Sequence, residues 1–294
     1  IFFVFLPTFS FALVNEEGVD KFRKSVNSIL SNTCLRKNNY GVKIYSLDRG
    51  ETLYEIRSKQ LFIPASNAKV LTTAVALKYL GSNYRFSTEF YTDGILENET
   101  LKGNLYIKGS GDPKLVTEQL WLIVNELRNL PIKKIKGNII ADDSFFDNQK
   151  RIQTWIKNPG AQAYEAPLGA LSFNFNTVKV YVSPGEKVGD RPGIVIEPEN
   201  EYIKLENNAQ TLRPGKRRRL IVNRVDKEDH DLITVSGGIN IGQPRAHYFL
   251  NITNPTQYAL SVFKSYIDLS GITFDGQLQR GKVPDDAMEL YIHE

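Results

Sequence analysis

Alternating apolar and polar residues dominate the chain between Val178 and His247, and this pattern restricts the possible folds more than any other. A period of two is typical of strands, and it occurs at Val178–Val182, Gly193–Ile196 and Leu232–Val235. The first 85 residues instead indicate a helix, a hairpin and a second helix. This order predicts a mixed α/β (α+β) fold with a large β-rich insertion, and it disfavours a βαβ array.

Local signals place the remaining elements. A hairpin is expected at 40–56, where Asp48-Arg49-Gly50 forms the turn between two alternating segments. A helix is expected from about Ser66 to Leu80, closed by Gly81, and another after Asn254-Pro255, because asparagine caps helices and proline favours their first turn. The other expected elements are helices at 15–32 and 115–130 and strands at 86–91, 103–108 and 135–141.

The composition excludes several classes of protein. The 294 residues include one cysteine, Cys34, and three scattered histidines, so neither an internal disulfide nor a metal cluster is expected. We expect no metal and no cofactor. A net charge of +4 does not predict binding to nucleic acid. The basic run Lys216–Arg219 fits either a solvated loop or a site for an anionic polymer.

The N-terminal residues Ile1–Val14 carry no charge, and they are too short for a transmembrane helix, which needs about 20 apolar residues. They fit the apolar region of a secretory signal peptide with cleavage after Ala12, and a buried N-terminal strand is the alternative. No later segment is apolar for long enough to cross a membrane. The pattern predicts an exported, periplasmic protein without a transmembrane segment. The apolar ending Glu289–Glu294 suggests a truncated reading frame.

The most informative candidate nucleophile is Ser66, which precedes Lys69 by three residues at the start of a predicted helix. Residues at this spacing share a helix face, so the lysine amine can reach the serine hydroxyl. Spacing alone leaves two interpretations open: a nucleophile with Lys69 as its base, or an N-cap serine. The rest of this helix, 70–77, is apolar on most faces, which predicts burial. A second Ser-x-x-Lys match, Ser261 to Lys264, lies well inside another predicted helix and serves as a control.

Several blocks of the sequence together resemble one family. The segment Pro64–Ala74 strongly resembles the active-site segment of the D-Ala-D-Ala carboxypeptidase/endopeptidase family, the class C low-molecular-mass penicillin-binding proteins. Gly41–Gly50 is similar to the hairpin that precedes the nucleophile in that family. Three further blocks are similar to segments of the domains that the family inserts into its catalytic domain: Gly109–Leu115, Asp142–Asp147 and Ala166–Asn176.

The resemblance implies the N-terminal half of a penicillin-binding/β-lactamase-like serine transpeptidase domain. It implies that Ser66 attacks the D-Ala-D-Ala end of a peptidoglycan stem peptide, that Lys69 is the general base, and that β-lactams acylate Ser66. The implied organisation is a signal-peptide remnant at 1–12, the first part of the catalytic domain at 13–85, a β-rich insertion at 86–109 and 177–283, a second α/β subdomain at 110–176, and the start of the returning catalytic domain at 284–294.

The resemblance implies two further motifs: a catalytic Ser-x-Asn, which comes after the insertion and is therefore expected just beyond Glu294, and a Lys-Thr-Gly. Ser172-Phe173-Asn174 spells the first motif, but it lies in a block that the family places in an inserted domain, and Ser25-Val26-Asn27 belongs to the first helix. Lys-Thr-Gly does not occur. We therefore expect this chain by itself to be inactive. The alternatives are a non-catalytic cell-wall-binding protein on the same fold and a serine β-lactamase or esterase.

The resemblance also implies contacts to the diamino acid of the substrate. Trp155 and Tyr164 are candidates for the aromatic residues of that site, with packing as the alternative for each, and Asn158 stands where we expect an aspartate. This asparagine argues against specificity for a diaminopimelate side chain. Three acidic residues are expected to serve only loops and turns: Asp112, Asp142 and Asp143.

Overall fold

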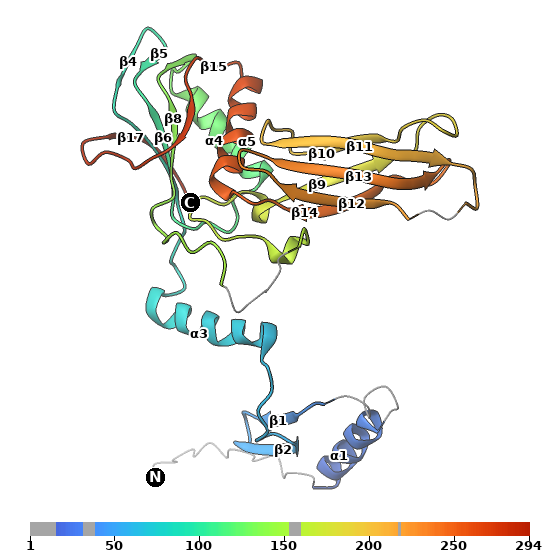
Figure 1. Cartoon of the computed structure of the whole chain (residues 1–294). Coiled ribbons are helices and arrows are strands. Elements are labelled where there is room, and N and C mark those ends of the chain that lie inside the picture. Colours follow the sequence, from blue (N-terminus) through green and yellow to red (C-terminus); the bar gives the residue numbers. More distant parts are fainter. Residues whose placement is uncertain (1–15, 32–38, 153–159, 217–218) are drawn as a thin grey trace, which may run out of the picture. The chain divides into compact units, whose positions relative to one another are not determined.

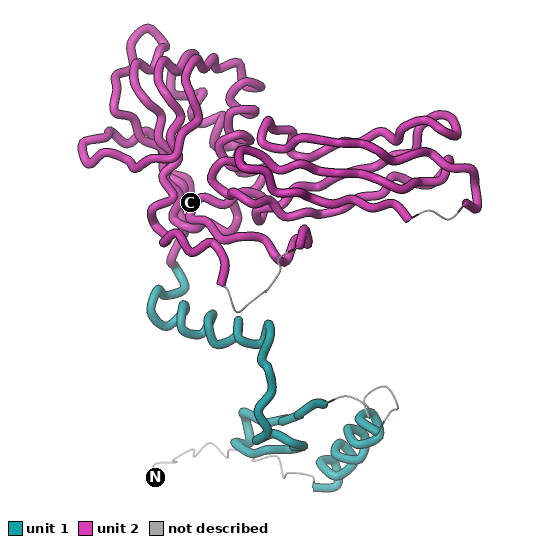
Figure 2. Tube along the Cα trace, in the orientation of Figure 1, with its two compact units in different colours: residues 1–83 teal, residues 84–294 magenta. Residues whose placement is uncertain are grey.

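The computed structural model describes residues 16–31, 39–152, 160–216 and 219–294. The chain divides into two compact units, residues 1–83 and 84–294 (Figure 2). The predicted signal-peptide remnant at 1–12 lies outside the described residues and stays a prediction. Within the described ranges, no helix combines the length and the apolar character that a membrane crossing requires.

The first unit contains a helix, a hairpin and a second helix, in the predicted order. The Tyr54 hydroxyl joins the first helix to the hairpin by donating a hydrogen bond to Asn27 Oδ1 at 2.7 Å. The elements are α1 (Glu16–Leu30), the antiparallel strands β1 (Val42–Ser46) and β2 (Glu51–Ile56), a 3-10 turn at Ala65–Asn67, and α3 (Ala68–Leu80).

Helix α3 is apolar on most faces, yet none of its side chains is buried. Val70 is 73% exposed and Tyr79 is 78% exposed. The prediction that this helix is buried is therefore wrong for the chain as described, because no described element of the first unit covers it. Exposed apolar surface on this scale is typical of a surface that packs against further protein.

The second unit is built around two sheets that follow one another along the same segments of the chain, and we call the line where one sheet passes into the other the bend. One sheet has the strand order β16-β8-β6-β3-β17, and the other has the order β15-β7-β5-β4. Four segments of the chain cross the bend, and their order is the same on both sides of it. One of these segments contains the strand predicted at 135–141, which is in fact two strands. The strands are β3 (Thr88–Thr92) and β4 (Ile95–Glu97), β5 (Thr100–Lys102) and β6 (Leu105–Gly109), β7 (Lys134–Lys136) and β8 (Ile139–Asp142), β15 (Thr273–Phe274) and β16 (Leu278–Arg280), and the edge strand β17 (Met288–His293).

Each strand that crosses the bend has a glycine there, and we call Gly94, Gly103, Gly137 and Gly276 the glycine row. A Cβ added to Gly137 would lie 2.1 Å from the carbonyl oxygen of Gly103. A Cβ added to Gly276 would lie 1.7 Å from the carbonyl oxygen of Gly137. No side chain fits at such distances, so the glycine row is what lets the backbones approach and the sheet bend.

Polar side chains supply hydrogen bonds at the bend, where the backbone ladder is interrupted. Asp93, Asn104 and Asn138 each accept a backbone N–H from the next strand. The donors are the N–H groups of Asn104 at 2.7 Å, Asn138 at 2.8 Å and Gln277 at 3.0 Å. Burial alone would raise the pKa of Asp93, but hydrogen bonds from Asn104 and Tyr106 outweigh it and hold that pKa below its ordinary value.

Two helices, α4 (Thr117–Asn129) and α5 (Pro255–Leu269), lie beside this sheet (Figure 1). Asn254 caps α5 by accepting the N–H of Gln257, and Pro255 occupies the first turn. The predicted start of this helix is therefore confirmed.

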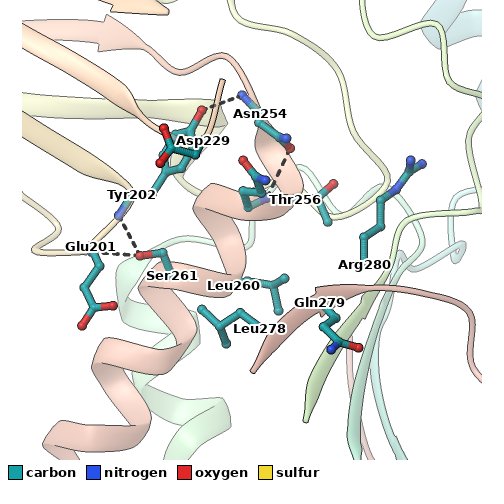
Figure 3. Close-up of a pocket in the computed structure, with 11 residues that line it drawn as sticks. Glu201, Tyr202, Asp229, Asn254, Thr256, Leu260, Ser261, Leu278, Gln279 and Arg280 are labelled. Carbon is teal, nitrogen blue, oxygen red and sulfur yellow. Dashed lines mark hydrogen bonds between the residues drawn. The ribbon is translucent and has the colours of Figure 1, made fainter. Parts of the chain in front are cut away.

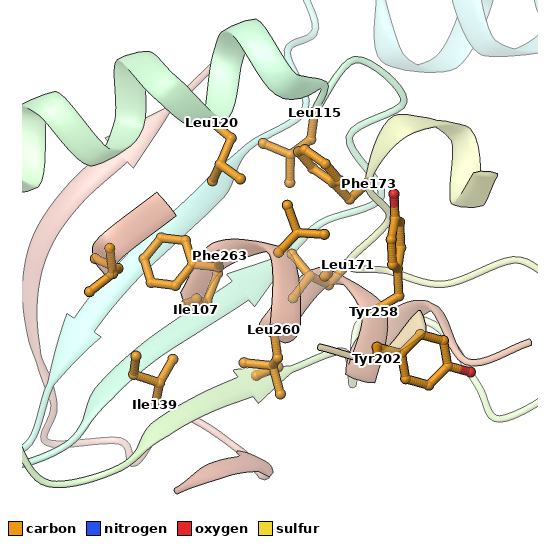
Figure 4. Close-up of a cluster of buried hydrophobic side chains, with 14 of the residues drawn as sticks. Ile107, Leu115, Leu120, Ile139, Leu171, Phe173, Tyr202, Tyr258, Leu260 and Phe263 are labelled. Carbon is orange, nitrogen blue, oxygen red and sulfur yellow. The ribbon is translucent and has the colours of Figure 1, made fainter. Parts of the chain in front are cut away.

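The hydrophobic core of the second unit lies between α5, α4 and the sheet (Figure 4), and it continues into the alternating segments, where Val180 and Val235 belong to the same cluster. Leu260 and Phe263 of α5 are each 2% exposed, and they belong to the same core cluster as Ile107 and Ile139 of the sheet. The ring centroids of Phe263 and Phe90 are 5.7 Å apart. Because burying one such side chain contributes about 1.5–3 kcal/mol, α5 holds this unit together.

The alternating segments form an elongated pair of three-stranded sheets, with the orders β10-β9-β14 and β11-β13-β12 (Figure 1). Val178, Val180 and Val182 of β9 are buried and alternate with partly exposed residues, which confirms the pattern predicted there. The domain boundaries predicted within residues 86–294 stay a prediction. The strands are β9 (Thr177–Ser183), β10 (Gly193–Glu197), β11 (Ile203–Leu212), β12 (Ile221–Asp226), β13 (Asp231–Asn240) and β14 (Ala246–Asn251).

Candidate active site

A tight turn before α3 positions Ser66. The backbone N–H of Asn67 donates to the Pro64 carbonyl at 2.9 Å, which closes the turn around Ser66. Ala65 has a φ of +44°, in the left-handed region that few residues other than glycine adopt. Backbone conformations of this kind cost about 1–3 kcal/mol and concentrate at functional sites.

The Ser66 side chain is paired with Lys69. Lys69 Nζ donates a hydrogen bond to Ser66 Oγ at 3.0 Å, and both residues are exposed. The N-cap interpretation of Ser66 is wrong, because Pro64 and Asn67 occupy the N-cap positions of the 3-10 turn and of α3, each without a side-chain cap hydrogen bond. The separation of Oγ and Nζ is short enough for direct proton transfer between them.

The second Ser-x-x-Lys match has a different arrangement, although the spacing is the same. Ser261 is buried, and its Oγ accepts the backbone N–H groups of Glu201 at 2.9 Å and Tyr202 at 3.0 Å (Figure 3). Lys264 Nζ instead contacts the carboxylates of Glu201 at 3.3 Å and Asp268 at 2.9 Å. This serine holds a loop against α5, so only the match at the start of α3 has the Ser–Lys contact.

The two Ser-x-Asn sequences also serve local structure. Ser172 Oγ donates to the carbonyl of Gly169 at 2.8 Å, and Asn174 Oδ1 accepts the N–H of Thr117 at 3.0 Å. The hydroxyl of Ser25 donates to a carbonyl of its own helix, α1. Neither sequence therefore supplies a side chain that is free for chemistry.

The residues predicted to contact substrate are only partly described. Tyr164 lies in a 3-10 turn at Ala163–Glu165 and is 79% exposed. Trp155 and Asn158 lie outside the described residues, so the predicted contacts stay predictions. In the part of the chain that the structure describes, no three His, Cys, Asp or Glu side chains are grouped so that they could hold a metal ion.

Asp112 serves a turn, as predicted, whereas Asp142 does so only in part, because this buried residue also accepts the N–H of Val283 at 2.9 Å, 141 residues away along the chain. Asp112 accepts the N–H of Lys114 at 2.8 Å, and Asp142 accepts the N–H of Ser144 at 2.9 Å. Burial alone would raise the pKa of Asp142, but the hydrogen bonds from Ser144 and Val283 outweigh it and hold that pKa below its ordinary value.

For Asp143 the prediction of a turn residue is wrong. Its buried carboxylate accepts the Thr256 hydroxyl at 2.5 Å and Arg280 Nε at 2.7 Å. Thr256 and Arg280 also line a cavity of ≈ 320 Å³ beside the start of α5 (Figure 3). These partners are 113 and 137 residues away along the chain, so no local signal could have revealed them.

The fold is that of a penicillin-binding protein. The structure of penicillin-binding protein 4 (dacB) from Haemophilus influenzae matches with a TM-score of 0.72 and 23% identity, over 87% of this chain and 56% of that chain. A structure of the same protein in complex with a novel β-lactam matches with a TM-score of 0.67 and 21% identity, over 87% of this chain and 54% of that chain.

The chain belongs to the D-Ala-D-Ala carboxypeptidase 3 (S13) family, which it matches over residues 22–294. It is 26% identical over 283 residues to the D-alanyl-D-alanine carboxypeptidase of Actinomadura sp. (strain R39), which is 94% of this chain and 52% of that protein. It is 23% identical over 263 residues to the D-alanyl-D-alanine carboxypeptidase DacB of Haemophilus influenzae, 87% of this chain and 53% of that protein. The chain spans about half the length of these curated relatives, and the family predicted from its sequence blocks is confirmed.

Proposed function

We propose that the protein is a serine-type D-Ala-D-Ala carboxypeptidase/endopeptidase that cleaves peptidoglycan stem peptides through an acyl-enzyme on Ser66. The 3.0 Å contact between Lys69 Nζ and Ser66 Oγ carries this proposal. Family membership supports the reaction class, and so do relatives that are named D-alanyl-D-alanine carboxypeptidases.

Lys69 acts as the general base in the proposed reaction. With its amine unprotonated, Nζ accepts the proton of the Ser66 hydroxyl while Oγ attacks the carbonyl carbon of the penultimate D-Ala. The bond to the terminal D-Ala breaks, and its nitrogen takes up the proton as it leaves. Water then hydrolyses the ester and Ser66 regains its proton. Backbone N–H groups, that of Ser66 among them, stabilise the oxyanion, and these steps use no metal or cofactor.

β-Lactams are proposed to acylate the same serine, because their ring carbonyl takes the place of the D-Ala carbonyl. The β-lactam complex of the Haemophilus influenzae protein supports this part of the proposal. We further propose that the 294 residues by themselves do not turn over substrate, because their sequence contains no Lys-Thr-Gly. Activity is therefore expected only from a protein that contains these 294 residues together with a Lys-Thr-Gly.

Labelling by fluorescent penicillin tests the role of Ser66. Ser66→Ala is expected to abolish the covalent label, and Lys69→Ala to slow acylation by about 10²–10⁴-fold. Ser261→Ala is the matched control, because it removes a serine with a lysine at the same spacing but without the contact. Labelling of Ser66→Ala at the wild-type rate would contradict the proposal.

Product analysis separates the proposal from its alternatives. Release of D-Ala from a stem peptide is the expected result. Fast hydrolysis of nitrocefin without D-Ala release would indicate a β-lactamase instead. Sedimentation with peptidoglycan sacculi, without labelling or product, would indicate a non-catalytic cell-wall-binding protein.

Export is proposed from the apolar residues 1–14. Protein recovered from the periplasm is expected to begin at Leu13, after cleavage behind Ala12. N-terminal sequencing measures this directly, and a periplasmic protein that still carries Ile1–Ala12 would contradict it.

A further inference from the structure

The cavity of ≈ 320 Å³ beside the start of α5, which we call the α5 cavity, adjoins the edge of a sheet (Figure 3). Strand β16 is the first strand in the order β16-β8-β6-β3-β17, and all three of its residues, Leu278–Arg280, line the cavity. Consecutive side chains of a strand point to opposite faces, so a lining of three consecutive residues includes the backbone edge of the strand. In the part of the chain that the structure describes, no further strand pairs with β16 at this edge.

The backbone groups of β16 alternate between the neighbouring strand and the open edge. The carbonyl of Gln277 accepts an N–H of β8 at 3.0 Å, and the N–H of Gly281 donates to a carbonyl of β8 at 3.0 Å. Gln279 lies between these two contacts and faces β8 as well, whereas the N–H and C=O groups of Leu278 and Arg280 face the open edge. Among the described residues, none forms a hydrogen bond with these four groups.

An open edge inside a cavity suits an extended peptide. Such a peptide pairs its main-chain groups with those of the edge strand, and the surrounding side chains select its sequence. Leu260 and Leu278 supply apolar contacts beside the edge, and Gln257 adds an exposed amide that can bond to a peptide group. A volume of ≈ 320 Å³ lies near the lower limit of ligand pockets, about 300 Å³, so the segment that enters the cavity is short.

The charges at the α5 cavity favour a cationic peptide. Glu201 and Asp229 line it, and their side chains are 72% and 86% exposed. Arg280 is the single cation among the described lining residues, and its Nε pairs with a buried carboxylate at 2.7 Å. Glu201 contacts Lys264 at 3.3 Å and Asp229 contacts His230 at 2.6 Å. Exposed pairs of this kind are weak, so a lysine or arginine of a peptide can replace either partner.

We propose that the α5 cavity binds a short, extended and positively charged segment of a partner protein, which joins the sheet as a strand beside β16. The free groups of Leu278 and Arg280 supply the main-chain hydrogen bonds, and the two acidic residues select lysine or arginine side chains. The same two carboxylates disfavour an anionic ligand. The flat surface of a membrane cannot follow a strand edge that lies within a cavity.

Fluorescence anisotropy and hydrogen exchange test the proposal together. The probe is a fluorescein-labelled hexapeptide of alternating valine and lysine, titrated with the 294-residue chain. We expect a dissociation constant below about 1 mM, and at saturation the amides of Leu278 and Arg280 should exchange about tenfold more slowly. Strand β17, at the opposite edge of the same sheet, is the internal control, and its amides should exchange at an unchanged rate.

Two altered peptides separate main-chain pairing from charge. N-methylation of two adjacent residues blocks both edges of the peptide, so binding is expected to weaken about tenfold or more. Replacing the lysines by glutamates is also expected to weaken binding about tenfold or more, because the carboxylates of the cavity then repel the peptide. Unchanged binding of the methylated peptide would overturn strand addition, and unchanged binding of the glutamate peptide would overturn the preference for cations.

A pair of double variants tests the acidic residues of the protein. Replacing Glu201 by glutamine and Asp229 by asparagine is expected to weaken binding of the valine–lysine peptide about fivefold. The matched control replaces Glu97 and Glu99 by glutamine, which removes the same charge from two exposed residues that pair with lysines away from the cavity. This control is expected to bind within about twofold of the wild type. Equal losses in the two variants would mean that net charge alone attracts the peptide.

The remaining outcomes each contradict the proposed occupant. A dissociation constant above about 1 mM, or slower exchange in β17 instead of β16, would overturn the proposal. Protection of Leu278 and Arg280 that depends on protein concentration and needs no peptide would make a second copy of the chain the occupant. Protection by a peptidoglycan stem peptide, but not by the hexapeptide, would make the cavity a substrate site. The α5 cavity lies within the second unit, so its test does not depend on the chemistry of Ser66.

Discussion

Replacing Gly137 by alanine tests the close approach of backbones in the glycine row. The added Cβ would lie 2.1 Å from the carbonyl oxygen of Gly103 and 2.9 Å from the N–H nitrogen of Asn104. Non-bonded heavy atoms prefer a separation of about 3.5 Å, so the neighbouring strand has to move by about 1.4 Å to relieve the contact fully. That movement weakens two hydrogen bonds across the bend, from Gly103 N–H to the Lys136 carbonyl at 3.2 Å and from Asn138 N–H to Asn104 Oδ1 at 2.8 Å.

These two effects give the expected size of the destabilisation. Overpacking of a filled site costs about 1–3 kcal/mol, and weakening the two hydrogen bonds without breaking them adds about 1 kcal/mol in total. We therefore expect Gly137→Ala to lower the free energy of unfolding by about 3 kcal/mol. For a unit of this size the thermal midpoint then falls by about 6–12 °C, which calorimetry or urea unfolding measures.

Gly193→Ala is the matched control for this substitution. Gly193 lies in β10, and a Cβ there meets no atom within 4 Å. This variant is expected to be neutral or to stabilise by about 0.4–1 kcal/mol, because alanine restricts the unfolded chain. If the two variants unfold within about 0.5 kcal/mol of each other, the reasoning about the glycine row is refuted.

Two further predictions concern buried polar groups. Ser261→Ala leaves two backbone N–H groups without their acceptor, so we expect it to lower the free energy of unfolding by about 2 kcal/mol and the thermal midpoint by about 4–8 °C. Ser265→Ala is the control, because it removes one hydroxyl within the same helix and should cost little. Equal losses in the two variants would refute the role of Ser261. Asp142 has a lowered pKa in the folded state, so its ionised form stabilises the protein above pH 3.8 and this contribution is lost as the pH falls further. Urea unfolding of Asp142→Asn at several pH values should therefore show a loss that is largest near neutral pH and shrinks below pH 3.8, and a loss independent of pH would contradict it.

The parts of the fold that rest on local signals could be predicted from the sequence. Asn254 and Pro255 mark the start of α5 because a cap and a first-turn proline act on the adjacent residues. The contact of Ser66 with Lys69 could be predicted in the same way, since three residues along a helix bring two side chains together. Spacing alone could not distinguish this pair from the second match, Ser261 and Lys264. Ser261 is held by a loop 60 residues earlier in the chain, which no local pattern reveals.

The features that depend on distant segments could not be predicted. The segment 135–141 looks like one strand, and its break at Gly137 follows from contact with Gly103, in a strand that pairs with it only in the folded chain. The apolar faces of α3 predicted burial, but periodicity identifies a face that needs a partner and does not supply the partner.

The close contacts within the glycine row couple its four positions, so we expect these positions to be constrained together during evolution. A larger residue at Gly103 would press on Gly94, and a larger residue at Gly137 would press on Gly103, so a substitution at either position is tolerable only if the neighbouring strand changes with it. In related proteins we expect these positions to vary together or not at all, although Gly94 and Gly276 lie near opposite ends of the second unit's sequence. The sequence signature of the bend is therefore the set of glycines on neighbouring strands. A comparison of one strand with the corresponding strand in related proteins would not reveal this signature.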